Sequence, residues 1–358
     1  MKKYLHYSLA ILAAAILVTS CSKDKKDDTI PPYDVPTTYN FEGANYLTST
    51  QRVKMALELN SYLGTATTAE ITSAKANDYF SNTNAPFTDL TLNTSGINLA
   101  EKTANGDTFK GYFVQRAANS TQRATPAAPG VAGFYGNRLV SATGLEYNQA
   151  VAKGMMGALF FKEAMNILAN ISSADNNTVT GGTTAMQRQW DEAFGYLSVP
   201  VDYDTARVYV NTDPIRPLLW GGYLAERGKS IQAGGVIFNA FLKGRAAIGA
   251  KDYNVVKEQA AIIQDKWEQL VAAAALAYTT IPTQSVNVGN LATQFHALSE
   301  GFGFVSCFEY RSSRTKLSNA DYQTLKTIIN TDFYTLINEV NFPKLVQAQN
   351  ILKATYGL

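Results

Sequence analysis

Apolar residues recur at intervals of three and four along most of this chain, and this spacing forms one face of an α-helix. The longest such runs are 145–171, 231–248 and 253–278. No stretch shows a sustained alternation of apolar and polar residues between hairpin turns. The sequence therefore predicts an all-α fold, built as a helical bundle. Shorter helices are predicted over 51–63, 69–79, 107–119, 184–197, 218–227, 285–307, 318–330, 332–338 and 343–355.

Two polar segments between these helices lack helical spacing. Residues 82–106 are rich in Asn and Thr, and residues 124–136 contain Pro126, Pro129 and three glycines. Both segments are predicted to be long loops. Loops of this length are uncommon inside a compact domain and are often functional or mobile. One hypothesis for them is contact with a partner protein or a glycan.

The start of the chain has the pattern of a lipoprotein leader. A basic start, Met1–Tyr4, precedes an apolar run over 8–18 that is too short to span a bilayer comfortably. Val18-Thr19-Ser20-Cys21 has the form of a lipobox, in which small residues precede the cysteine that is acylated. The sequence predicts a signal peptide over 1–20 and a membrane anchor through lipidated Cys21. The alternative is an ordinary signal peptide with an incidental cysteine.

A charged, proline-containing segment follows the predicted lipidation site. Residues 22–28 contain no large apolar residue, and three prolines favour extended chain at 31, 32 and 36. We therefore expect residues 21–38 to be a lipidated, disordered tether, followed by a single helical domain over 39–358. A charged run directly after the acylated cysteine resembles the surface-export signal of Bacteroidetes lipoproteins. This resemblance implies an outer-membrane lipoprotein at the cell surface, with the periplasmic face as the alternative.

Charge and cysteine content exclude several classes of site. The net charge is +2 and the basic residues are scattered, which argues against a nucleic-acid partner. With Cys21 used by the lipid, Cys307 is left alone, so neither a disulfide framework nor a cysteine-rich metal site is expected. Cys307 lies among apolar neighbours and is predicted to be a packed thiol.

The only histidine after the predicted signal peptide lies in a helix predicted over 285–307. His296 and Glu300 are four residues apart, so they lie one above the other on the flank of its apolar stripe. A histidine and a carboxylate in this register can share a proton or bind a metal. They can equally form a buried hydrogen-bonded pair.

A motif occurs twice in the chain. Glu192-Ala193-Phe194-Gly195-Tyr196 and Glu300-Gly301-Phe302-Gly303-Phe304 share the pattern Glu-small-Phe-Gly-aromatic, and a Lys-Gly pair precedes each one, at 153–154 and 243–244. The repetition predicts two related helical halves, roughly 140–200 and 231–307. Coincidence is the alternative, because Gly and Phe are common here. If the halves are related, Arg188 takes the place of His296, and an Arg188–Glu192 pair corresponds to the His296–Glu300 pair.

Several runs resemble the DUF4856 family of Bacteroidetes lipoproteins, a family of unknown function. The resemblance extends from about Tyr39 to the end of the chain, and its most specific part is Trp190-Asp191-Glu192-Ala193-Phe194-Gly195-Tyr196-Leu197. The other runs are 144–149, 153–159, 243–248 and 296–301. More distantly, Phe295-His296-Ala297 followed by a glutamate resembles the imelysin-like proteins. Those proteins are all-helical, duplicated envelope proteins linked to iron uptake and once described as peptidases. Their motif has two residues between His and Glu, whereas this chain has three.

These observations lead to three functional hypotheses. The first is a surface lipoprotein that binds a small ligand, or iron or another divalent metal, at a polar site between the two halves. The second is an imelysin-like hydrolase, and the third is a structural or interaction protein in which the polar residues only hold the core together. The metal-site residues would be His296, Glu300, Asp191 and Glu192. The other polar candidates are Glu146, Gln149, Lys153, Arg188 and Arg245.

Overall fold

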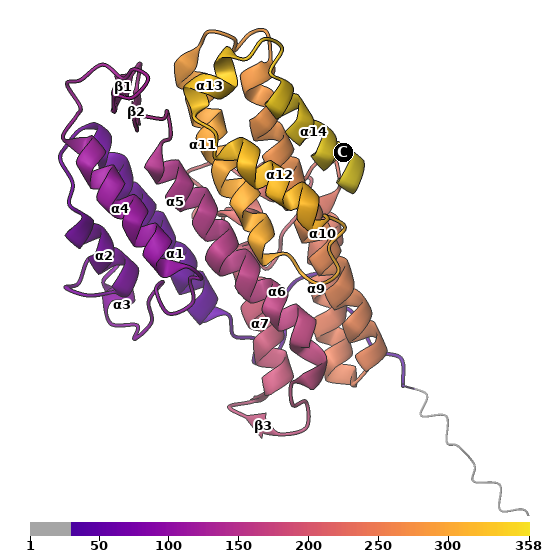
Figure 1. Ribbon diagram of the computed structural model, residues 1–358. Helices are drawn as coiled ribbons and strands as arrows, with labels where there is room; N and C mark the ends of the chain where they lie inside the picture. The colour runs from indigo at the N-terminus through magenta and orange to yellow at the C-terminus, as the bar shows by residue number, and fades with distance from the viewer. Residues whose placement is uncertain (1–29) are drawn as a thin grey trace, which may run out of the picture. The chain divides into compact units, whose positions relative to one another are not determined.

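The structure is a computed structural model, and it describes residues 30–358. The predicted signal peptide and Cys21 lie outside the described residues. The chain from Pro32 to Leu358 forms one compact unit (Figure 1). Among the described residues, no helix is both long enough and apolar enough to cross a membrane.

This unit is all-α, as the helical spacing predicted. The run predicted over 145–171 is continuous, with a π-helical turn, η2, between α5 and α6. Thr184 and Asp252 cap α7 and α10 through side-chain oxygens that accept backbone N–H groups. The α-helices are α1 Leu47–Gly64, α2 Ser73–Ser81, α3 Leu90–Asn93, α4 Gly106–Ser120, α5 Tyr147–Met155, α6 Lys162–Asn170, α7 Ala185–Leu197, α8 Trp220–Glu226, α9 Ala233–Ala250, α10 Tyr253–Thr280, α11 Leu291–Cys307, α12 Asn319–Ile329, α13 Phe333–Asn338 and α14 Pro343–Tyr356.

Short π-helical and 3-10 segments join several of these helices. The π-helical turn η2 covers Met156–Phe161. The 3-10 turns are η1 Thr65–Thr67, η3 Ile171–Ser173, η4 Ile281–Thr283 and η5 Phe308–Tyr310.

The chain also forms two small antiparallel hairpins, and the first begins in the predicted loop over 124–136. The first pairs β1, Gly133–Tyr135, with β2, Arg138–Val140, and the second pairs β3, Val179–Thr180, with β4, Thr183–Thr184. The turn of the first hairpin includes Gly136 at a φ of +60°, a conformation that glycine adopts without strain. Strands of two or three residues are too short to give a detectable alternation in sequence, so the prediction missed them. The predicted loop over 82–106 also contains the short helix α3.

The start predicted for α2 was wrong. A helix over 69–79 would have Thr68 as its N-cap, but the helix begins at Ser73, and the Thr72 hydroxyl accepts the N–H of Lys75 at 3.2 Å. Thr68 instead donates back to the carbonyl of Thr65 and closes the turn η1. A threonine hydroxyl can serve either role, and the local sequence does not distinguish them.

Helix α11 lies between α5 and α10 and is close to both (Figure 1). Its approach to α5 depends on Gly303, because a Cβ there would lie 2.4 Å from the Cβ of Lys153. Cys307, at the end of α11, packs against Gly157 in the π-helical turn, where an added Cβ would lie 2.6 Å from the Cys307 sulfur. Its thiol is buried and donates to the carbonyl of Gly303 at 3.3 Å. Burial raises the pKa of this thiol, which is the behaviour of a packed rather than a reactive cysteine.

The helices that carry the repeated motifs pack across the two predicted halves. Lys153-Gly154 on α5 contacts Gly303 on α11, although the two motifs belong to different halves. Gly244 on α9 likewise contacts the Trp190 ring on α7. Helices of the two predicted halves therefore pack directly against each other. At each of these contacts, at least one of the two helices contributes a glycine.

Replacing Gly244 with alanine is expected to lower the free energy of unfolding by about 2 kcal/mol. The new Cβ would lie 2.0 Å from the Trp190 ring, which is fully buried and donates its indole N–H to the Phe241 carbonyl. The control is Gly249→Ala on the same helix, where nothing lies within 4 Å of an added Cβ. That change should stabilise the helix by about 0.5–1 kcal/mol. Urea unfolding measures both free energies, and equal effects would mean that Gly244 and Trp190 do not pack this closely.

Candidate functional site

His296 on α11 lies between two carboxylates. Its Nδ1 is 3.0 Å from Oε1 of Glu146, which directly precedes α5, and its Nε2 is 3.4 Å from Oε1 of Glu300, one turn along α11. The Glu146 and Glu300 side chains are 4% and 9% exposed, and that of His296 is 26% exposed. Each ring nitrogen therefore has its own carboxylate partner.

The start of α5 is held against α11 by a hydroxyl. The backbone N–H of Glu146 donates to Oγ of Ser299 at 2.9 Å, and the Ser299 hydroxyl donates to the carbonyl of Phe295 at 2.7 Å. Arg138 of β2 also lies near Glu146, with Nε 3.9 Å from Oε1. These contacts fix the position of the Glu146 carboxylate relative to the His296 ring.

Glu300 joins three further elements to the cluster. Lys153 Nζ on α5 is 3.6 Å from Glu300 Oε1, and the Tyr223 hydroxyl on α8 lies 3.3 Å from Oε2. The Tyr223 hydroxyl is also 3.0 Å from that of Tyr278 on α10. The Lys153 ammonium lies over the Tyr223 ring, 5.3 Å from its centroid. The His–Glu pair predicted on one helix is thus part of a cluster built from α5, α8, α10 and α11.

The electrostatics of the cluster keep His296 and Glu300 charged. Burial alone would lower the pKa of His296, but the hydrogen bonds and negative charges of Glu146 and Glu300 outweigh it and raise this pKa to about 9. Burial alone would raise the pKa of Glu300, but the His296 hydrogen bond and the Lys153 charge lower it to about 2. Burial and the Glu300 charge raise the pKa of Tyr223. At neutral pH His296 is an imidazolium, and neither ring nitrogen has a free lone pair.

A cavity of about 1350 Å³ opens beside this cluster. His296, Glu300, Lys153, Tyr223 and Tyr278 all line it. The rest of its wall comes from α1, α5, α8, the loops over 203–219 and 227–232, the first turns of α9, η4 and α11. The volume exceeds that of most small-molecule sites, which are about 300–1,000 Å³.

Asp191 and Arg245, two other predicted site residues, form a separate buried pair. Arg245 Nε donates to Asp191 Oδ1 at 2.8 Å, and both side chains are almost fully buried. The Tyr39 hydroxyl donates to the same oxygen at 2.8 Å, and the Asn45 N–H approaches Oδ2 at 3.3 Å. The Tyr39 ring stacks on Phe194 at 3.6 Å between centroids. These contacts hold the segment from Tyr39 to Asn45, which precedes α1, against α7 and α9.

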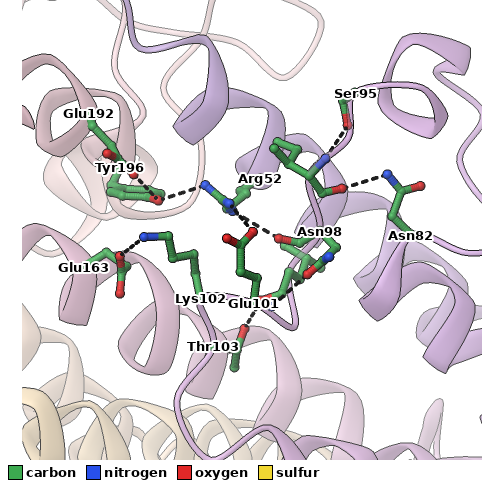
Figure 2. A network of polar contacts seen from close by, with 12 residues as sticks. Arg52, Asn82, Ser95, Asn98, Glu101, Lys102, Thr103, Glu163, Glu192 and Tyr196 are labelled. Atoms are coloured by element: carbon green, nitrogen blue, oxygen red, sulfur yellow. Dashed lines mark hydrogen bonds and ion pairs between the residues drawn. The ribbon is translucent and has the colours of Figure 1, made fainter. Parts of the chain in front are cut away.

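Glu192 lies in a third network, shown in Figure 2. Its Oε1 accepts the Tyr196 hydroxyl at 3.0 Å, and Arg52 Nη1 on α1 lies 3.4 Å from that hydroxyl. Arg52 also donates to the Asn98 carbonyl and to Glu101, each at 3.1 Å. Glu192 therefore helps to hold the predicted loop over 82–106 against α1 and α7 (Figure 2).

Arg188 and Glu192 do not form the predicted ion pair. Arg188 Nη1 donates to the carbonyls of Thr183 and Thr180, at 2.7 and 3.0 Å. The capping box of Thr184 and Gln187 starts α7 directly after β4, which puts Arg188 within reach of the hairpin carbonyls. Gln149 is half-buried, and its backbone N–H donates to the Glu146 carbonyl at 2.9 Å.

The four residues predicted to bind a metal therefore make their contacts in three different networks. Asp191 and Glu192 are adjacent in sequence, but they point to opposite partners, Arg245 and Tyr196. Over residues 30–358, no group of three or more His, Cys, Asp and Glu side chains is arranged to hold a metal ion. Sequence reasoning also missed Tyr223 and Tyr278, because no spacing links them to the histidine helix.

A family model described as a domain of unknown function, DUF4856, matches residues 36–341. The chain belongs to the DUF4856 family. The match includes Glu146, Lys153, His296 and Glu300, and also the Asp191–Arg245 pair. No curated protein and no solved structure matches this DUF4856 chain.

Proposed function

We propose that this DUF4856 chain is a binding protein that holds a small molecule in the cavity beside His296. The observation that carries the proposal is the cavity of about 1350 Å³, which is lined by tyrosines and by charged side chains. A concave site with apolar walls and a few convergent polar groups is the usual form of a ligand pocket. The contacts around His296 and Glu300 tie together the helices that form one wall, so this wall is organised before a ligand arrives.

The chemistry of His296 favours binding over hydrolysis and over metal binding. A general base must be neutral to accept a proton, but the pKa of His296 is raised to about 9. A metal ligand must offer an unprotonated ring nitrogen, and both nitrogens here face carboxylates. The Ser299 hydroxyl donates to the backbone carbonyl of Phe295 rather than to the His296 ring. The metal and hydrolase hypotheses have less support than a small-molecule site.

A cavity-filling variant tests this function. In a thermal-shift screen of a metabolite library, some compounds should raise Tm; at about 100 times Kd, binding adds about 2.7 kcal/mol to stability. The variant Gly235→Phe should abolish these shifts, because Gly235 lines the cavity and only Thr205 comes within 4 Å of an added Cβ. The control is Gly249→Phe on the same helix, which lies outside the cavity lining and faces open space.

Two outcomes of this screen would count against a binding role. One is that no library compound raises Tm of the parent protein. The other is that Gly235→Phe responds as strongly as the parent and as Gly249→Phe. The urea-unfolding free energies of both variants, measured without compounds, show whether each variant remains folded.

We propose further that the domain is held at the outer membrane, at the cell surface, through lipidated Cys21. The support is the lipobox and the charged run that follows it. When the full chain is expressed in a bacterium fed radiolabelled palmitate, the protein should carry the label, and Cys21→Ser should lose it. Cys307→Ser is the matched control and should keep the label, because that thiol is buried. Labelled Cys21→Ser protein would contradict the anchor, and resistance to protease on intact cells would favour the periplasmic alternative.

A further inference from the structure

The charged side chains that line the cavity are mostly cations. The six basic ones are Lys153, Arg207, Arg216, Arg227, Lys229 and His296. The three acidic ones are Asp204, Glu226 and Glu300. This imbalance alone does not define a ligand, since a cation that is paired within the protein is not available to bind one.

Most of the cations are already paired. Lys153 and His296 face Glu300, as described above. Arg227 Nη2 is 2.9 Å from Glu226, and Arg207 Nη2 is 2.6 Å from Asp213, a residue outside the cavity lining. These contacts leave Arg216 and Lys229 as the candidates for an external partner.

Within the described residues, neither Arg216 nor Lys229 has a carboxylate within 4.0 Å. Arg216 has one long contact, 3.5 Å from Nη1 to the carbonyl of Asp213. The two residues lie on either side of α8 in the sequence, and both line the same cavity. Of the lining acids, Asp204 also lacks a basic partner, and its Oδ1 accepts the N–H of Ala206. The unpaired charges of the wall thus sum to one positive charge.

Part of the lining is apolar and at least partly exposed. The side chains here come from α1, the loop over 203–219, α9 and η4. They are Leu57, Val208, Leu219, Val236 and Ile281. An ion without a hydrocarbon body would leave this surface in contact with water, which is unfavourable.

We propose that the ligand of this cavity is an organic anion with an apolar body, and that Arg216 and Lys229 bind its anionic group. This inference rests on the proposed function, and it adds the chemical class of the ligand. A carboxylate or sulfonate would supply the acceptor oxygens that the guanidinium and the ammonium lack. The hydrocarbon part would lie on the apolar lining.

Two fluorescent probes with the same aromatic ring system test this class. Anilinonaphthalene sulfonate is anionic, and N-phenylnaphthylamine is its uncharged counterpart. The parent protein should bind the sulfonate at least about tenfold more tightly than the neutral probe. The double variant Arg216→Gln/Lys229→Gln should lose this preference and keep its affinity for the neutral probe. The control Lys251→Gln/Lys257→Gln removes the same charge outside the cavity lining and should bind like the parent.

The outcomes distinguish a failure of the anionic class from a failure of the binding function. If both probes bind equally and Gly235→Phe blocks both, the cavity binds ligands but the anionic class is wrong. If the sulfonate is preferred equally by the parent and by the Arg216/Lys229 double variant, the assignment of these two cations is wrong. If Gly235→Phe binds the probes as the parent does, the probes do not enter the cavity, and the binding function fails as well.

Discussion

Replacing Arg245 with methionine is expected to lower the free energy of unfolding by about 4 kcal/mol. Arg245 and Asp191 are 3% and 0% exposed, so removing the guanidinium leaves a carboxylate buried without a counter-charge. The Tyr39 hydroxyl and the Asn45 N–H still contact that carboxylate, but neither carries a charge. Burial already raises the pKa of Asp191 in spite of Arg245, and the variant should raise it further. The loss should therefore be largest near neutral pH and smaller in acid.

An exposed pair elsewhere provides the matched control for Arg245. Arg314 contacts Asp265 through two bonds of 2.9 and 2.7 Å, but the two side chains are 46% and 45% exposed. Arg314→Met should cost less than about 1 kcal/mol, because water screens and replaces this pair. Urea unfolding of the two variants side by side measures the difference. Comparable losses would mean that burial does not control the strength of the Asp191–Arg245 pair.

A double variant separates the interaction from the cost of an unpaired charge. Asp191→Leu/Arg245→Met removes both charges and should be more stable than Arg245→Met alone, because no carboxylate is left unpaired in the core. A double variant that is less stable than the single one would show that the charges themselves are required there.

The helices could be predicted from sequence because their apolar spacing is local. The run over 253–278 corresponds closely to α10, Tyr253–Thr280, which Asp252 caps. The π-helical turn η2 could not be predicted, because it accompanies the contact between Gly157 and Cys307, residues far apart in the chain. The short hairpins were missed for a different reason, since a strand of three residues has no period to detect.

Side-chain partners were harder to predict than helices. Two pairs had the same spacing of four, yet only His296 and Glu300 are in contact, at 3.4 Å. Arg188 reaches hairpin carbonyls instead, because α7 begins directly after β4. The spacing along a helix shows which side chains could contact each other. Whether they do depends on the neighbouring elements, which can offer a different partner. Glu146 was a candidate, but its pairing with His296 depends on a contact between α5 and α11 that no local pattern encodes.

His296 should make this chain less stable as the pH rises from about 6.5 to 9. Its pKa is about 9 in the folded chain, whereas the ordinary value for an unfolded one is 6.5. Because the folded pKa is the higher one, the stabilisation is complete below 6.5 and is lost as the pH rises through 9. The difference between the two values corresponds to about 3 kcal/mol. The variant His296→Gln should lack this loss, since glutamine does not titrate.

Glu300 should make the chain less stable as the pH falls, which is the opposite pH dependence to that of His296. Its folded pKa of about 2 is below the ordinary glutamate value of 4.5. The stabilisation from Glu300 is therefore complete above 4.5 and is lost as the pH falls through 2. Between 4.5 and 6.5 both groups contribute in full, so the cluster should stabilise the fold most in this window. Urea unfolding at a series of pH values measures both limbs of this profile.

The titration of His296 can also be observed directly. It is the only histidine among the described residues, so its ring carbon and proton signals in an NMR spectrum need no assignment by mutation if the leader is absent. The midpoint should lie near 9, and Glu300→Gln should move it down, because the neutral amide cannot stabilise the imidazolium as a carboxylate does. A parent midpoint at or below 6.5 would mean that the ring is neutral at physiological pH. In that case His296 would be available as a base or a metal ligand, and the argument for a purely binding role would lose its chemical basis.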